Sequence, residues 1–147
     1  MKDLLVVVDL SGSMYVMGKS FIIGNILSTL SLLEKNEEIS IKKIKWDGSG
    51  KSFEEIAEKC SGKNTLLLTD GYSLSDNCRG KRSVKTFFEQ NVNNFFIVLC
   101  GGDSLDITSS KEFSRVHSVK ADNILQAIES FSWDNGEKSE EDGEDWE

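Results

Sequence analysis

The stretch LLVVVDLSGSM, residues 4–14, decides how the chain folds. Its first five residues are apolar and mostly β-branched, which is typical of a strand buried on both faces of a parallel sheet. The strand stops at Asp9, and a polar loop containing a glycine follows at once. Ligands of open α/β sheets bind beyond the carboxyl ends of such strands. The stretch therefore predicts a buried strand, expected at the centre of the sheet, and a candidate binding loop after it.

Strands and helices alternate along the rest of the chain. Helical spacing of apolar residues predicts helices over residues 18–33, 52–60, 82–91 and 122–131, with a small helical patch near 111–114. Apolar runs predict strands over 39–46, 65–69, 95–100 and 116–119. The strand at 39–46 carries several lysines, so we expect it nearer a sheet edge. This alternation predicts an α/β fold with a doubly wound, mostly parallel, Rossmann-like sheet flanked by helices.

Composition separates a folded body from an acidic end. The 147 residues fit a single domain, and the formal net charge is −8. Residues 134–147 contain eight acidic residues and one lysine, so residues 1–133 are left with a net charge near −1. We therefore predict a domain over residues 1–132 and an acidic, disordered segment over 133–147. A body without excess positive charge argues against nucleic-acid binding.

The cysteines and the apolar runs indicate where the protein works. Cys60, Cys78 and Cys100 are an odd number and lack the spacing of a metal site, so we expect reduced thiols. No apolar run reaches membrane-spanning length, and the first residues lack the pattern of a signal peptide. These features predict a cytoplasmic protein without a membrane partner.

Two polar loops follow buried strands of the predicted sheet. Asp9, Ser11 and Ser13 alternate along the first loop, and Asp70 follows the strand at 65–69. Hard oxygen ligands with few carboxylates suit Mg²⁺ or Mn²⁺. A cation held in this way keeps open coordination positions, so it can attract an Asp or Glu of a protein partner. We expect an adhesive metal site at this edge of the sheet.

These residues resemble the von Willebrand factor A family. DLSGSM after a buried first strand and TDG at 69–71 stand in the order of that family's metal-ion-dependent adhesion site, and the resemblance spans residues 2–131. It implies that Ser11 and Ser13 touch the metal directly, whereas Asp9 and Asp70 act mainly through waters. It also implies a non-enzymatic binding or adaptor module. Stand-alone intracellular members often serve MoxR-type AAA+ ATPases or other multiprotein systems.

The middle ligand of the adhesion site departs from the family pattern. The family has a threonine there, whereas this chain reads Gly48-Ser49-Gly50-Lys51-Ser52 and places Lys51 at that position. Ser52, or alternatively Ser49, could replace the threonine as a ligand. If neither reaches the metal, the fold remains as a scaffold with a degenerate metal site. We expect the partner-binding rim of the site to contain the residues beside these loops: Met14, Tyr15, Lys51, Gly71 and Tyr72.

Three other interpretations of these motifs remain open. GSGKS at 48–52 resembles a phosphate-binding loop, which would make the protein nucleotide-binding or nucleotide-hydrolysing, although Lys45 stands where that motif needs glycine. GDSL at 102–105 matches a hydrolase nucleophile motif, but His117 is the only histidine and no acid stands at the required spacing, so acyl transfer is disfavoured. Asp9 and Ser11 could also simply cap the following helix.

Overall fold

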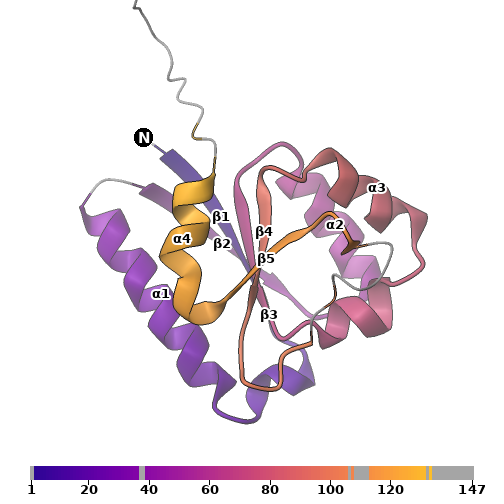
Figure 1. Ribbon diagram of the computed structural model, residues 1–147, viewed down its shortest axis with the longest axis horizontal. Helices are drawn as coiled ribbons and strands as arrows, with labels where there is room; N and C mark the ends of the chain where they lie inside the picture. The colour runs from indigo at the N-terminus through magenta and orange to yellow at the C-terminus, as the bar shows by residue number, and fades with distance from the viewer. Residues whose placement is uncertain (1, 37–38, 106, 108–112, 132, 134–147) are drawn as a thin grey trace, which may run out of the picture.

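The computed structural model describes residues 2–36, 39–105, 107, 113–131 and 133. Its five strands form one sheet in the order β2-β1-β3-β4-β5, and every neighbouring pair is parallel (Figure 1). The strand order reverses between β1 and β3, so chain connections leave these two strands toward opposite edges. This is the switch point at which α/β sheets bind ligands. The strands are β1 Lys2–Asp9, β2 Ile39–Trp46, β3 Thr65–Thr69, β4 Phe95–Leu99 and β5 His117–Lys120.

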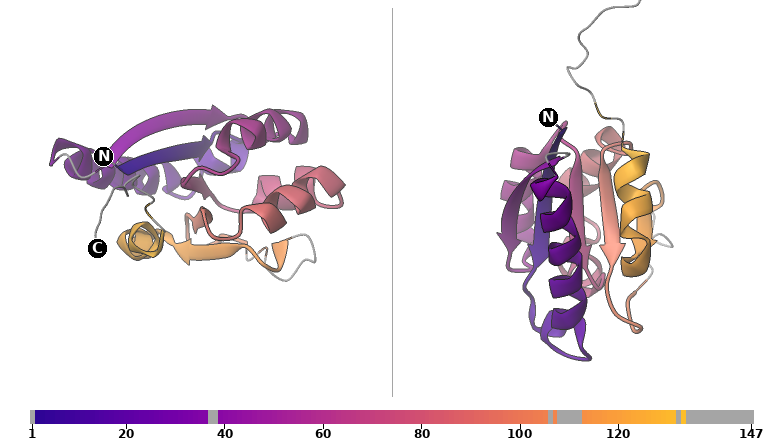
Figure 2. Two further views of the ribbon diagram at one scale, coloured as in Figure 1. Left: turned by 90° about the horizontal axis from the view of Figure 1, so that it is seen from above. Right: turned by 90° about the vertical axis from the view of Figure 1, so that its left-hand side faces the viewer.

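Helices cover both faces of the sheet, as Figures 1 and 2 show. Helices α1 (Lys19–Lys35) and α4 (Ile124–Ser130) lie on one face, and α2 (Gly50–Cys60) and α3 (Arg82–Gln90) lie on the other. Three short turns complete the described elements: η1 Gly12–Tyr15, η2 Leu74–Cys78 and η5 Ala121–Asn123. The predicted doubly wound, Rossmann-like α/β fold is therefore confirmed.

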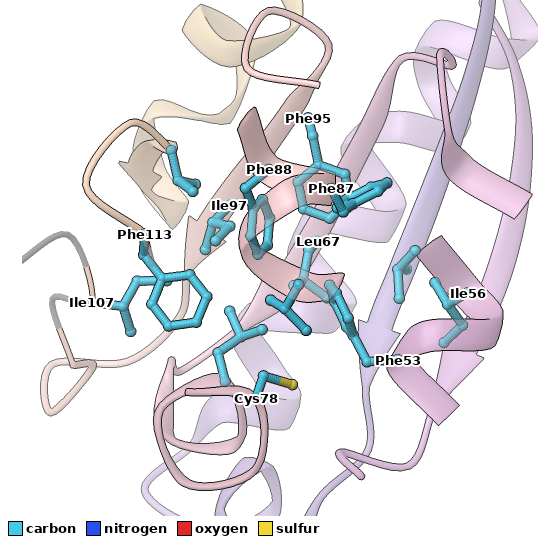
Figure 3. Close-up of a cluster of buried hydrophobic side chains, with 14 of the residues drawn as sticks. Phe53, Ile56, Leu67, Cys78, Phe87, Phe88, Phe95, Ile97, Ile107 and Phe113 are labelled. Carbon is cyan, nitrogen blue, oxygen red and sulfur yellow. The ribbon is translucent and has the colours of Figure 1, made fainter. Parts of the chain in front are cut away.

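The hydrophobic core has two halves, one on each side of the sheet. Leu66 and Leu68 of β3 point toward α1 and α4, whereas Leu67 points toward α2 and α3. Because side chains alternate along a strand, a strand that is apolar at every position fills both halves. On the α2 and α3 side, aromatic rings pack edge to face around Phe88, as the close-up in Figure 3 shows. This packing holds α3 against the start of β4.

The strands lie at the sequence positions that we predicted, but their order in the sheet differs from the prediction. The lysine-bearing strand β2 lies at a sheet edge as predicted, but the central strand is β3, whereas β1 lies one place away. Trp133 belongs to the folded body because its ring packs on Phe131 and its Nε1 donates to the Ile128 carbonyl at 3.2 Å. Trp133, which we assigned to the acidic segment, thus packs against the end of α4. Residues 111 and 112 of the helical patch expected near 111–114 lie outside the described residues, as does the whole segment 134–147.

Within the ranges that the structure describes, no helix has the length and apolar character needed to cross a bilayer.

Candidate functional site

Asp9 ends β1 and is completely buried. Its Oδ1 accepts a hydrogen bond from the Ser11 backbone N–H at 2.9 Å, and its Oδ2 accepts one from the Thr69 hydroxyl at 2.6 Å. Thr69 in turn accepts from the Gly71 N–H at 3.1 Å. These bonds tie the loop after β1 to the loop after β3. They place the Asp9 carboxyl group at the switch point of the sheet.

The first loop contains two serines, and Ser11 does not act as a helix cap. Ser11 stands at the start of η1, yet its side chain makes no capping hydrogen bond. Its Oγ is buried and has no hydrogen-bond partner among the described residues. Ser13 lies within η1 and is partly exposed. A buried hydroxyl without a partner is costly, so Ser11 Oγ marks a position where a ligand atom would be stabilised.

A buried lysine, Lys19, holds the second carboxylate. Lys19 is the first residue of α1 and is fully buried, as is Asp70. Its Nζ donates to Asp70 Oδ2 at 2.9 Å, to Asp103 Oδ2 at 3.0 Å and to the Ser13 carbonyl at 3.1 Å. The three protons of an ammonium are thereby all used. Asp103 comes from the loop after β4, and its Oδ1 is buried without a partner among the described residues.

The charges of this group decide how Lys19 is protonated. Burial alone would lower the pKa of Lys19, but the hydrogen bonds and charges of Asp70 and Asp103 outweigh burial and raise the pKa above 10.5. Lys19 therefore stays an ammonium at neutral pH. We refer to Asp9, Ser11, Ser13, Lys19, Asp70 and Asp103 as the carboxyl-end cluster. Three carboxylates and one ammonium give it a formal charge of −2 when all are ionised.

The serine hydroxyls of the middle loop make hydrogen bonds within that loop. Ser49 caps α2, because its Oγ accepts from the Ser52 N–H at 3.1 Å. The Ser52 hydroxyl donates to Asp47 at 3.1 Å, and the Ser49 N–H donates to the same carboxylate at 2.8 Å. These bonds, led by that of the Ser49 N–H, lower the pKa of Asp47. Among the described residues, no hydrogen bond joins Ser49 or Ser52 to Asp9, Ser11 or Ser13.

Lys51 does not reach the carboxyl-end cluster through any contact within the described part of the chain. It lies exposed in the first turn of α2. The ammonium that occupies the cluster belongs to Lys19 instead. The turn at 48–52 also leads into α2. In this turn the Ser49 N–H already donates to Asp47, and the Ser52 N–H donates to Ser49 Oγ. Those two donors are not available to cradle a phosphate.

The predicted partner-binding rim is only partly accessible. Met14 packs in the core on the α1 side, and Gly71 is buried, so neither contributes to an exposed rim. Tyr72 is half-buried, with its hydroxyl donating to the Asp103 carbonyl at 2.7 Å, whereas Tyr15 is exposed. Five exposed apolar side chains lie along the loop and the start of α1, and we call them the apolar patch: Leu10, Tyr15, Val16, Met17 and Phe21.

The donor set fits a cation that needs few protein ligands. Among the described residues, no three His, Cys, Asp or Glu side chains are grouped so that they could hold a metal ion. Mg²⁺ commonly binds through one or two carboxylates and keeps several waters. Asp9 supplies a carboxylate, and Ser11 and Ser13 supply hydroxyls, of which Ser11 Oγ has no other partner in the part of the chain that the structure describes. Asp70 is already bound to Lys19, so its role in holding a cation would be indirect.

Three members of this network were not predicted as site residues: Lys19, Thr69 and Asp103. A lysine in the first turn of a helix is opposed by the helix dipole, and Lys19 is the first residue of α1, five residues after the DLSGSM loop. Asp103 follows the end of a predicted buried strand, as Asp9 and Asp70 do. The same rule about carboxyl ends would have found it.

Comparisons with known proteins concern the fold alone. No family model and no curated protein match the chain. Its structure is similar to the crystal structure of a fragment of a "putative lipoprotein" from Peptoclostridium difficile 630, with a TM-score of 0.54 and 14% sequence identity. The match covers 88% of this chain and 93% of that chain. At such an identity it supports the α/β architecture and carries no function across.

Proposed function

We propose that the protein is a non-enzymatic protein-binding module of the von Willebrand factor A type, which binds its partner at the carboxyl-end cluster. The observation that carries the proposal is the buried Ser11 hydroxyl, which has no partner among the described residues, in a residue whose backbone N–H donates to the Asp9 carboxylate. Structures rarely retain such a group without a use for it. An adhesive site needs a polar atom that makes no hydrogen bond within the protein and can therefore bind a ligand.

A divalent cation is the ligand that this group suits. Asp9, Ser11 and Ser13 would hold Mg²⁺ or Mn²⁺, and the cluster's formal charge of −2 favours a divalent ion. When bound, the ion would offer a coordination position to an Asp or Glu of the partner. This chain's own residues keep the site in shape, because Thr69 fixes the orientation of Asp9 and Lys19 fixes that of Asp70.

The apolar patch provides the second half of the proposed binding surface. Phe21 is 79% exposed and Met17 is 72% exposed. Both follow the loop that contains Asp9, Ser11 and Ser13. Met17 also has a left-handed backbone with a φ of 58°, which is unusual for a residue other than glycine. Interfaces commonly surround a polar anchor with apolar side chains that exclude water. We therefore expect a partner with an acidic residue next to apolar ones, such as a MoxR-type AAA+ ATPase.

A metal-independent module is the second candidate, and Lys19 is the observation that favours it. The Lys19 ammonium already bridges Asp70 and Asp103 at 2.9 and 3.0 Å. An internal cation of this kind neutralises part of the charge that would attract Mg²⁺. In this case the fold acts as a scaffold, and partner binding is indifferent to a chelator.

Thermal unfolding of the wild type and Ser11→Ala, with Mg²⁺, with Mn²⁺ and with EDTA, tests the first candidate. An ion at ten times its Kd stabilises the native state by about 1.4 kcal/mol, which raises Tm by roughly 3–6 °C. We expect this rise in the wild type and its loss in Ser11→Ala. In EDTA, Ser11→Ala should be as stable as the wild type or more stable, because it removes an unsatisfied hydroxyl.

Two further variants complete the test. Ser28→Ala removes an exposed hydroxyl from α1 and should keep the full response to the ion. Asp9→Asn preserves the shape of the carboxylate and should lose the response. A rise in Tm that survives in Ser11→Ala and Asp9→Asn would place the ion elsewhere and contradict the metal site. A wild type without any rise would favour the metal-independent module.

A further inference from the structure

A second polar surface lies at the opposite end of the sheet from the carboxyl-end cluster. A pocket of about 640 Å³ opens beside the start of β1, and its lining includes Lys2, Lys42, Lys63 and Trp133. Asparagines 64, 93 and 94 add amide groups, and Asp3 is the one acidic residue of the lining among the residues that the structure describes. We call this the lysine pocket. Figure 1 shows that the start of β1 and the end of α4 meet at this end of the molecule.

Trp133 fixes the point from which the rest of the chain continues. Its ring packs against Phe131 with centroids 5.4 Å apart, and its Nε1 donates to the Ile128 carbonyl at 3.2 Å. The Lys2 ammonium lies 5.5 Å from the centre of the same ring, which is within the range of a cation–π contact. The chain therefore leaves the folded body from the wall of the lysine pocket.

We propose that the acidic segment 134–147 of the same molecule binds in the lysine pocket. The segment has eight acidic residues against one lysine, and its first acidic residue, Asp134, directly follows Trp133. Glu137 comes four residues after Trp133, which an extended chain spans in about 14 Å. A tether this short gives the acidic side chains an effective concentration on the order of millimolar at the three lysines. Charge and position both direct the segment to this pocket.

The carboxyl-end cluster is the competing destination, and its charge argues against it. Fourteen extended residues span about 48 Å, so chain length alone would allow the segment to reach the other end of the sheet. The cluster has a formal charge of −2 from its own residues, so without a bound cation it repels carboxylates. The lysine pocket attracts them. Binding there would also keep the segment away from the proposed adhesion site, although the inference does not depend on that site.

Zero-length carbodiimide crosslinking of the full-length protein tests the proposal, with peptide mapping by mass spectrometry. We expect amide crosslinks from Lys2, Lys42 or Lys63 to carboxylates between Asp134 and Glu147, found in the monomer band. Their yield should fall several-fold between 0.01 M and 1 M salt, because the Debye length falls from about 30 Å to about 3 Å. Lys51, exposed at the other end of the sheet, should not crosslink to the segment.

A pair of double variants with equal charge provides the control. Lys42→Glu with Lys63→Glu removes two lysines from the pocket and should abolish the crosslinks from Lys2. Lys43→Glu with Lys45→Glu changes the charge equally at exposed positions of β2 outside the pocket lining and should leave them intact. Equal loss in both variants, absence of crosslinks in the wild type, crosslinks to Lys51 or crosslinks confined to a dimer band would each overturn the proposal.

Discussion

At the scale of single residues, Lys19 has the least expected position in the structure. Lysine is seldom fully buried, and the first turn of a helix is an unfavourable place for a positive charge. Asp70 and Asp103 offset both costs with hydrogen bonds of 2.9 and 3.0 Å. The lysine joins the loops after β1, β3 and β4 into one group. Its loss should therefore affect the whole carboxyl-end cluster.

Replacing Lys19 with methionine should lower the free energy of unfolding by about 3–5 kcal/mol, because a buried carboxylate is left without its partner. Denaturant unfolding measures the change. Lys35→Met removes an exposed lysine from the end of the same helix and should change stability by no more than about 0.5 kcal/mol. Adding Asp70→Asn to Lys19→Met should reduce the loss, since the unpaired charge disappears. Additive effects of the two substitutions would contradict the predicted ion pair.

The contribution of Lys19 should also depend on pH. Its pKa in the folded state is raised above 10.5, so folding favours the protonated form. The stabilisation is therefore complete below the unfolded-state pKa of about 10.5 and is lost as pH rises through the folded-state value. The difference in unfolding free energy between wild type and Lys19→Met should be constant from pH 7 to 9 and shrink above about 10.5. A difference that stays constant to the highest accessible pH would argue against an ionised Lys19.

At the scale of elements, the turn before α2 supports the first loop of the site. Gly48 has a φ of 90°, and its carbonyl accepts from the Asn77 side-chain amide at 2.7 Å. A Cβ at this position would stand 2.8 Å from both Ser11 Cβ and Ser73 Oγ. The turn must therefore have glycine for two reasons, its backbone conformation and the closeness of Ser11.

Gly48→Ala and Gly62→Ala separate these two reasons. Gly62 has a φ of 74° with open space where its Cβ would be, so Gly62→Ala introduces backbone strain of about 1–2 kcal/mol and no clash. Gly48→Ala adds the overlap with Ser11 and should cost a further 1–3 kcal/mol or so. The free energies of unfolding of the two variants give the comparison. Equal losses would mean that the turn is not packed against the first loop.

The elements themselves were largely predictable because their hydrophobic patterns are strong. The apolar runs at 65–69 and 95–99 are buried at every position, and β2 carries exposed lysines, as a strand at the edge should. The order of strands was less predictable, since an apolar run shows that a strand is interior and does not show which strand is central. The π-helical turn at Leu74–Cys78 has no sequence period of its own and was not expected.

The part of the candidate site that lies directly at the ends of the predicted strands could be predicted from the sequence. Asp9, Ser11 and Asp70 lie at the carboxyl ends of their strands as expected. The partners that complete the cluster come from far along the chain: Lys19 and Asp103 are 84 residues apart, and Thr69 and Asp9 are 60 apart. No spacing rule connects residues at such separations. Ser49 and Ser52 were expected as alternative ligands because the family resemblance places a threonine ligand in their loop, whereas they bind Asp47 within their own turn.

At the scale of the whole molecule, the three cysteines report on the integrity of both halves of the core. Cys60 and Cys78 lie on the α2 and α3 side of the sheet, and Cys100 lies on the α1 and α4 side. All three are free thiols with no more than a trace of exposed surface. Burial raises the pKa of Cys78 and of Cys100 to about 12, and it raises that of Cys60 as well. They are protonated at neutral pH and shielded from reagents.

Alkylation with iodoacetamide at pH 8 should therefore modify none of the three thiols in the native protein and all three in denaturant. Mass spectrometry of the intact protein counts the labels. In mild denaturant, Cys60, Cys78 and Cys100 should react together, because their exposure requires the sheet to lose its helices on both faces in one cooperative transition. Earlier labelling of Cys100 alone would mean that α1 and α4 detach before the other half of the core. Rapid labelling of any of the three under native conditions would contradict the packing described above.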